Sequence, residues 1–368
     1  MFGHKRIPSR EGGVEVVVEE LSKRMVQMGH NVTCYNRRGH HVCGEVYDSQ
    51  VSTQTYQGIQ ICTVPTFDKK GLAAVTASIT AAIKATFDDS EIVHIHAEGP
   101  SFMCWLPKLF GKKVIVTVHG LDHQRAKWGH FARTYIMWGE KNAARFADNI
   151  IVLSKSVQDY FLQNYSRETV LIPNGVIKHT PVKGDIIYDK YALNKDDYIL
   201  YLGRLVPEKG LGYLINAFKN VKTQKRLVIA GGSSDTCEFE EKLHRLAQDD
   251  ERIIFTGFVQ GEMLSELYSN AYIYVLPSNI EGMPLSLLEA MSYGNCCLTS
   301  DIPECKDVIG DMGVTFQQSN VDDLQRKIQY LCNNCDKVKF MKNGSQKYIC
   351  DKYNWDAVVS QTLDVYRK

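Results

Sequence analysis

Short runs of β-branched and aliphatic residues alternate with amphipathic stretches along the whole sequence. This alternation is typical of parallel sheets with helices on both faces, so we predict an α/β chain with a doubly wound domain in each half. Buried strands are expected at residues 31–35, 58–63, 91–96, 113–119, 149–153 and 169–172, and again at 198–203, 226–230, 252–256, 271–276 and 295–299. Helices are expected at 209–221, 284–293 and 355–366.

The length of 368 residues supports two domains, since a single domain usually has roughly 100 to 200 residues. Pro173, Asn174 and Gly175 supply turn chemistry, and the polar stretch that follows, to Asn194, has little periodicity. We therefore expect a first domain at 1–176, a second at 177–350, and a helix at 351–368 that packs back on the first.

The charge balance argues against nucleic acid as the main partner, because 43 Lys and Arg face 42 Asp and Glu. No apolar run reaches the roughly 18 residues that span a bilayer, and residues 1–10 do not resemble a signal peptide, which predicts a cytoplasmic protein. The 11 cysteines then favour reduced thiols. Cys332 and Cys335 form one C-x-x-C motif without a second pair, so no metal site is predicted.

The first helix begins at Gly12 and Gly13, yet almost no strand precedes it. In a doubly wound sheet this strand is central, and its two neighbours lose their shared hydrogen-bonding partner without it. We therefore expect that the first strand is missing and that the true start lies upstream.

Two carboxylates flank a helix start in the segment Glu281-Gly-Met-Pro-Leu-Ser-Leu-Leu-Glu289. Pro284 suits the first helical position, so the free amides of this turn and the positive helix end favour an anion such as a phosphate ester. Glu281 is placed to reach a polar group beyond the phosphates, and Glu289 to accept hydrogen bonds from vicinal hydroxyls such as those of ribose. The alternative is that both are ordinary solvated carboxylates.

A second loop, from Gly203 to Gly210, places Arg204 and Lys209 between a strand end and a helix. A planar guanidinium and a compact ammonium together suit a diphosphate, although two solvated charges beside a turn are the alternative. Their position at the carboxyl edge of a sheet favours function.

Two further features point to ligand binding in the first half. Gly12 and Gly13 allow a ligand to approach the backbone at a helix start, but the dinucleotide fingerprint G-x-G-x-x-G is absent. His119 ends a predicted strand, where it would donate to a sugar hydroxyl or serve as a structural histidine. His94 and His96 share one strand face, and we favour packing roles for them.

These residues together resemble the family-four glycosyltransferases of the GT-B fold over nearly the whole chain. The motifs that carry the resemblance are Gly12-Gly13, His119, Pro173-Asn174-Gly175, Gly203-Arg204, Lys209-Gly210, and Glu281 with Glu289. The segment Lys5-Arg6-Ile7-Pro8 is similar to a bacterial subgroup associated with capsule and cell-surface polysaccharides. The resemblance implies two Rossmann-like domains that face each other across a cleft.

The resemblance also implies the roles of single residues. Arg204 and Lys209 would neutralise the diphosphate of a nucleotide-sugar donor, and Glu289 would hold its ribose. His119 and Glu281 would contact the donor sugar. The amides expected to cap the phosphate oxygens are those of Gly282, Met283, Leu285 and the Gly12-Gly13 loop, while Gly257-Phe258-Val259 would lie against the base.

Members of this family transfer the sugar with retention at the anomeric carbon, so the resemblance implies a hexosyl- or deoxyhexosyltransferase with a glycan or lipid-linked acceptor. The leaving diphosphate can serve as the base, and neither a metal nor another cofactor is expected. Charge grows on the diphosphate as the bond breaks, so Arg204 and Lys209 would stabilise the transition state most.

The stretch from residue 101 to 113 mixes apolar and basic side chains without an acidic one. Its members are Phe102, Trp105, Leu106, Leu109, Phe110, Lys108, Lys112 and Lys113. They suit peripheral contact with an anionic inner membrane, or else form a core helix with a solvated basic end, which we favour.

Two other functions fit parts of this pattern. A nucleotide-sugar epimerase of similar architecture would also bind diphosphate and ribose, but it needs no acceptor, and the spacing of Glu281 and Glu289 argues against it. The second is a non-catalytic glycan-binding protein on the same fold, which would be recognised because it does not bind a nucleotide-sugar donor.

Overall fold

The computed structural model describes residues 1–39, 53–67, 72–125, 128–232 and 237–368. The chain divides into two compact units, each with its own hydrophobic core. Unit 1 comprises Met1–Gly175 and Trp355–Lys368, and unit 2 comprises Val176–Asn354. The backbone therefore passes between the units twice. Both units are α/β structures built on parallel sheets, which confirms the predicted fold class.

Unit 1 contains a parallel sheet of order β4-β5-β6-β7 and a three-stranded sheet of order β1-β3-β2. Its strands are β1 (Thr33–Arg37), β2 (Thr53–Tyr56), β3 (Ile59–Val64), β4 (Ile92–His96), β5 (Lys113–Val118), β6 (Asn149–Val152) and β7 (Val170–Leu171). The sequence did not predict β2, which pairs antiparallel with β3. Gly58 was expected to begin a strand, but it has a positive φ of 80° and forms the turn between β2 and β3.

Phe2 forms an isolated β-bridge with Ile95 at the position expected for the first strand. Its N–H donates to the carbonyl of His94 (3.1 Å), and its own carbonyl accepts from the N–H of His96 (2.8 Å). On the other side, the N–H of Tyr35 in β1 donates to the carbonyl of Met1 (2.9 Å). No strand is assigned before the first helix among the described residues, as expected, yet β1 and β4 both find hydrogen-bonding partners in this segment.

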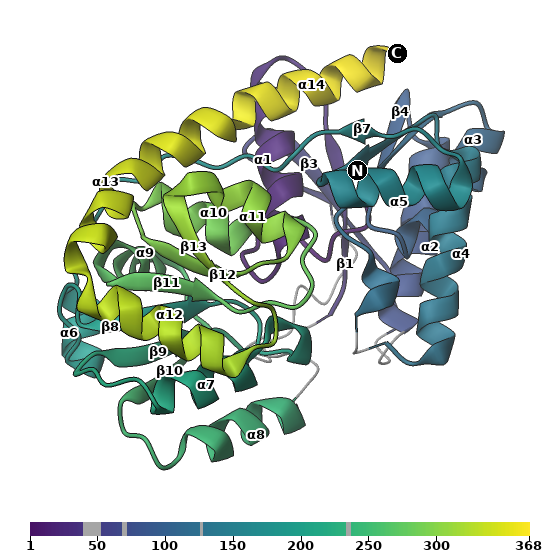
Figure 1. The fold of residues 1–368 in the computed structure, drawn as a ribbon. Coiled ribbons are helices and arrows are strands. Elements are labelled where there is room, and N and C mark those ends of the chain that lie inside the picture. The colour runs from purple at the N-terminus through teal and green to yellow at the C-terminus, as the bar shows by residue number, and fades with distance from the viewer. Residues whose placement is uncertain (40–52, 68–71, 126–127, 233–236) are drawn as a thin grey trace. The chain divides into compact units, whose positions relative to one another are not determined.

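The helices of unit 1 follow the predicted alternation. They are α1 (Gly13–Gln27), α2 (Leu72–Phe87), η1 (Pro100–Met103), α3 (Trp105–Leu109), η2 (Asp122–Gln124), α4 (His130–Phe146), α5 (Lys155–Tyr165) and α14 (Trp355–Arg367). The terminal helix α14 lies beside α1, yellow against purple in Figure 1. A Cβ on Gly175 would lie 2.5 Å from the Trp355 ring, so this close packing requires glycine.

Unit 2 is built on one six-stranded parallel sheet of order β10-β9-β8-β11-β12-β13. Its strands are β8 (Tyr198–Leu202), β9 (Arg226–Ala230), β10 (Ile253–Gly257), β11 (Ile273–Leu276), β12 (Cys297–Ser300) and β13 (Gly313–Phe316). All four residues of β11 are buried, as expected for a central strand covered on both faces. The edge strand β13 was not predicted, because it is short and mostly only half-buried.

The helices of unit 2 correct the sequence analysis in two places. They are α6 (Asp185–Tyr191), η3 (Pro207–Lys209), α7 (Leu211–Lys219), α8 (Cys237–Ala247), α9 (Gly261–Asn270), α10 (Leu285–Ser292), α11 (Pro303–Ile309), η4 (Gly310–Met312), α12 (Val321–Asn333) and α13 (Cys335–Lys352). The supposed hinge contains α6, which buries Ile187 and donates that residue's N–H to Glu266. The helix predicted to begin at Lys209 begins at Leu211. No described helix is long and apolar enough to cross a membrane.

Candidate active site

Two loops meet at the carboxyl edge of the unit 2 sheet, one after β8 and one after β11. Gly210 has a φ of 68°, and a Cβ there would lie 2.0 Å from the carbonyl oxygen of Pro277. The N–H of Asn279 donates to the carbonyl of Glu208 (2.8 Å). Because the two backbones touch, side chains from both loops are presented at one place.

Lys209 and Glu281 form an ion pair across these loops. The Lys209 Nζ lies 2.5 Å from the Glu281 Oε1, and the two side chains are only 14% and 8% exposed. Lys209 belongs to the 3-10 turn η3, so Gly210 separates it from α7 and it does not stand at the helix start as expected. The sequence placed both residues near a phosphate but did not predict that they pair.

Arg204 is half-buried in the loop after β8 and makes no ion pair within the described part of the chain. Its carbonyl accepts a hydrogen bond from the Tyr201 hydroxyl (2.9 Å), which fixes the backbone beneath the side chain. The loop therefore offers one guanidinium whose charge is not paired and one ammonium that shares its charge with Glu281. An anionic ligand at this edge would meet both cations.

The start of α10 offers backbone donors, although its geometry differs from the expectation. Pro284 was expected as the first helical residue, but its ψ of 98° is extended and makes it the N-cap, so α10 begins at Leu285. The N–H groups of Gly282 and Leu285 donate to no acceptor in the described chain. Free amides at the positive end of a helix form an anion site.

Glu289 lies in the second turn of α10 and is held by Tyr268. The Tyr268 hydroxyl lies 3.4 Å from the Glu289 Oε2 and 3.2 Å from the carbonyl of Ser286. Burial, and then the charge of Glu289, raises the pKa of Tyr268 well above its usual range, so the phenol stays protonated and donates. The carboxylate is thereby oriented before any ligand binds.

Glycines bring the neighbouring loops of the sheet edge close together. Gly231 has a φ of 140°, and a Cβ there would lie 1.9 Å from the carbonyl oxygen of Gly203. Its N–H donates to the carbonyl of Gly257 (2.8 Å). Val259, expected near the base, is 8% exposed and packs in the core, so its segment would present backbone to a ligand.

In unit 1, a carboxylate lies at the start of α1. Gly12 is the N-cap, and Gly13 is the first helical residue. A Cβ on Gly12 would lie 2.2 Å from the Glu15 Oε2, while the Glu15 Oε1 accepts the N–H of Lys5 (2.7 Å). An anion at this glycine pair would have to displace the Glu15 side chain.

His119 also lies in unit 1, beside the stacked pair His94 and His96. Its Nε2 lies 3.1 Å from the Nδ1 of His96, and burial lowers the pKa of His119 to about 4. His96 stacks on His94 with ring centres 4.2 Å apart. His94 contacts the hydroxyls of Thr117 and Tyr366, both at 2.7 Å, which confirms its packing role. His119 is therefore a neutral imidazole with one nitrogen engaged.

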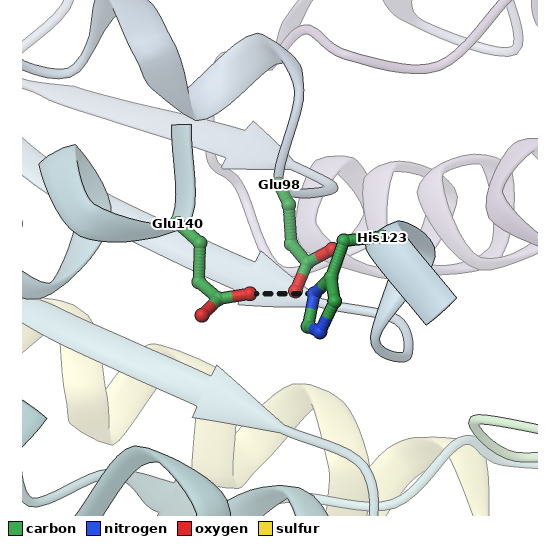
Figure 2. A group of neighbouring side chains, drawn as sticks. All are labelled: Glu98, His123 and Glu140. Carbon is green, nitrogen blue, oxygen red and sulfur yellow. Dashed lines mark ion pairs between the residues drawn. The ribbon is translucent and has the colours of Figure 1, made fainter. Parts of the chain in front are cut away.

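The structure thus brings together the unit 2 residues Arg204, Lys209, Glu281 and Glu289, while Gly12, Gly13 and His119 lie in unit 1. Sequence reasoning missed one polar cluster, formed by Glu98, His123 and Glu140 in unit 1 (Figure 2). Two of these residues could have been found from the sequence, because Glu98 follows β4 and His123 follows β5 at the carboxyl edge of the same sheet. Glu140 lies within a helical sequence pattern, and nothing in that pattern marks it as a site residue.

Comparison with known proteins matches each half of the chain to a glycosyltransferase family. Residues 11–178 match the family described as Glycosyltransferase Family 4, and residues 185–348 match Glycosyl transferases group 1. An uncharacterised glycosyltransferase of Methanocaldococcus jannaschii, MJ1607, is 30% identical over 173 residues. That match covers 46% of this chain and 44% of the relative, less than half the length of each.

Solved structures share the fold over nearly the whole chain. Sucrose-phosphate synthase from Thermosynechococcus elongatus superposes with a TM-score of 0.83 and 22% identity, covering 97% of this chain and 93% of that one. Anabaena Alr3699/HepE, solved in complex with UDP-glucose, gives a TM-score of 0.78 and 15% identity, covering 99% and 98%. At these identities the likeness establishes the GT-B fold alone.

Proposed function

We propose that this chain transfers a sugar with retention from a nucleoside-diphosphate sugar to a glycan or lipid-linked acceptor. The chain has the GT-B fold, and each of its halves matches a glycosyltransferase family. The observation that carries the proposal is the unit 2 sheet edge. There Lys209 pairs with Glu281, and Arg204 makes no ion pair among the described residues. The amides of Gly282 and Leu285, at the start of α10, donate to no acceptor in the same part of the chain. Cations and amides suit the diphosphate, and carboxylates suit sugar hydroxyls.

In this proposal each group has one task in donor binding. Arg204 grips two diphosphate oxygens, and the amides of Gly282 and Leu285 cap others. The Glu289 carboxylate, already oriented by Tyr268, accepts the hydroxyls of the ribose. UDP-glucose, which Alr3699/HepE was solved with, contains all of these groups and supports the donor class.

The Lys209–Glu281 pair would rearrange when the donor binds. The ammonium would turn to the phosphate, which leaves the Glu281 carboxylate to accept the donor sugar's hydroxyls. As the glycosidic bond breaks, negative charge grows on the diphosphate, and the cations stabilise that charge more strongly than the ground state. The departing phosphate oxygen takes the acceptor's proton on the same face, so the sugar is transferred with retention and no metal is assigned to this step.

A donor screen tests the proposal. Nucleoside-diphosphate sugars with uracil, guanine, thymine and adenine are titrated against the protein, and we expect at least one to raise the melting temperature. Glu289→Gln should weaken its binding about tenfold or more, because hydrogen bonds to a charged group contribute roughly 1.5–3 kcal/mol. Glu262→Gln, at an exposed position on α9, is the matched control and should bind normally. If no nucleotide sugar shifts the melting temperature, the proposed function is wrong.

We also propose that α3 and the end of α2 contact an anionic membrane surface, on the cytoplasmic face where the acceptor lipid would lie. The favoured expectation of a core helix is wrong for three residues, because Trp105, Leu109 and Phe110 are 38%, 74% and 53% exposed. Phe87 is 67% exposed and packs edge-on against Phe110 at 5.0 Å. An exposed aromatic and aliphatic patch of this kind suits insertion into a lipid interface.

The nearby lysines contribute less charge than their number suggests. The Lys108 ammonium pairs with Asp148, and that of Lys112 donates to the carbonyl of Asp88 (2.6 Å). Lys113 donates to the carbonyl of Tyr366 (2.7 Å). We therefore expect apolar burial to provide most of the binding energy.

Co-sedimentation with vesicles that contain anionic phospholipid tests the membrane proposal. We expect the protein to bind at low salt. The Leu109→Glu, Phe110→Glu double variant should bind at least about a hundredfold more weakly, since burying each side chain contributes roughly 1.5–3 kcal/mol and the variant loses both contributions. Leu162→Glu, at an exposed leucine of α5, is the control. Equal sedimentation of the wild type with and without vesicles would exclude the membrane contact.

A further inference from the structure

Three side chains that the transfer proposal does not use point at one another in unit 1 (Figure 2). Glu98 lies after β4, His123 in η2 after β5, and Glu140 on α4. One ligand atom of each lies within 4.8 Å of the other two. Glu98 and Glu140 are both 0% exposed, so two carboxylates are buried side by side. Such a pair requires positive charge.

The hydrogen bonds around Glu140 leave one of its oxygens facing the cluster. The hydroxyls of Tyr160 and Tyr165 both donate to the Oε1, at 2.8 and 2.5 Å. The Oε2 lies 3.0 Å from the His123 Nδ1, but neither atom has a hydrogen bond of good geometry in the described chain. One oxygen is thus fully engaged, and the other is directed at the imidazole and Glu98.

Glu98 shows the same division between its two oxygens. The Oε2 accepts the N–H of Asp122 (2.7 Å), while the buried Oε1 has no hydrogen-bond partner among the described residues. Arg125, which ends η2, is paired with Asp122 at 3.0 Å. A bound cation would satisfy the unpartnered oxygen of this fully buried carboxylate, which lies beside two other ligand groups.

We propose that Glu98, His123 and Glu140 bind a divalent cation. Two carboxylate oxygens and one imidazole nitrogen form a mixed ligand set that suits Mn²⁺ or Zn²⁺, with water completing the coordination. The cation would tie the loop after β5, which also carries His119, to α4 and to the end of β4. Its role would be structural, and all three ligands come from unit 1.

A shared proton is the competing way to neutralise the cluster. Burial, and then the charge of Asp122, raises the pKa of Glu98 well above its usual range when no cation is bound. Glu98→Gln separates the two cases, because an amide mimics the protonated acid in shape but is a poor ligand for a divalent cation.

Mn²⁺ is the probe, since carboxylate and imidazole bind it whereas the thiols of this cysteine-containing chain prefer softer metals. Chelator-treated protein without nucleotide is titrated with Mn²⁺ and followed by electron paramagnetic resonance and by melting temperature. We expect saturable binding and stabilisation in the wild type. Glu98→Gln and His123→Ala should bind at least about tenfold more weakly, in line with the penalty for disturbing a metal site.

Two exposed residues of the same unit, Glu91 and His130, provide the controls Glu91→Gln and His130→Ala, which should bind as the wild type does. The metal-free Glu98→Gln protein should melt at or above the temperature of the metal-free wild type, which shows that the variant folds. If the wild type binds no Mn²⁺, or if both cluster variants bind it normally, the cation site is refuted and the proton is left as the neutralising charge.

Discussion

Arg204→Ala and Lys209→Ala should each lower turnover by about two to three orders of magnitude, the scale of losing one donor that stabilises a developing oxyanion. Both cations lie in the loop between β8 and α7, where charge would grow on the leaving diphosphate. The measurement is kcat at saturating donor and acceptor. Near-normal turnover in both variants, with a confirmed donor, would contradict the assigned roles.

The two variants should differ in stability, which separates charge loss from structural damage. Arg204 has no ion-pair partner in the described chain, so its removal should leave the melting temperature unchanged. Lys209→Ala leaves the Glu281 carboxylate, 8% exposed, without its cation and should lower the melting temperature. Adding Glu281→Gln to Lys209→Ala should restore stability but not turnover. Lys222→Ala, an exposed lysine of the same unit, is the control.

Gly210→Ala should destabilise unit 2 by about 2–4 kcal/mol, because it combines a left-handed backbone conformation with a steric clash. The φ of 68° disfavours a side chain, and the added Cβ would lie 2.0 Å from a backbone oxygen of Pro277 that has no freedom to move. We expect a lower urea midpoint for unit 2, and weaker donor binding because the loop that carries Lys209 is displaced.

Gly212→Ala is the matched control, two positions further along. Gly212 lies inside α7, and a Cβ there would meet nothing within 4 Å. Alanine is the better helix former by up to about 1 kcal/mol, so this variant should be slightly more stable than the wild type. A Gly210→Ala protein as stable as Gly212→Ala would show that the two loops do not need their backbone contact.

The sequence predicted most of the strands whose residues are buried on both faces of a sheet. Central parallel strands such as β8 and β11 read as continuous apolar runs because both faces are covered. The edge strands β2 and β13 were missed because they are short and neither has a continuous apolar run. The edge strand β10 was predicted because residues 253–255 are all apolar. The helix α6 was read as a linker because seven residues bury little more than Ile187 and give no clear period.

The sequence predicted which loops form the candidate site, but not which side chains contact each other within it. The rule that ligands bind at the carboxyl ends of parallel strands placed Arg204 and Glu281 at one edge, although they are far apart in sequence. That Lys209 pairs with Glu281 depends on the positive φ of Gly210, which a sequence alone does not reveal. Whether a carboxylate such as Glu98 or Glu140 is buried depends likewise on side chains brought together only by folding.

The helix α14 sets the order in which the protein can fold as it is synthesised. Unit 2 is continuous in sequence, whereas unit 1 is completed only when α14 joins α1 through the Arg24–Asp356 pair and the Tyr366 hydroxyl reaches His94. Because ribosomes add roughly 5–20 residues per second, unit 1 must wait on the order of ten seconds or more after Gly175 emerges. During that wait the histidine stack lacks Tyr366, and the face of α1 that contacts α14 stays uncovered.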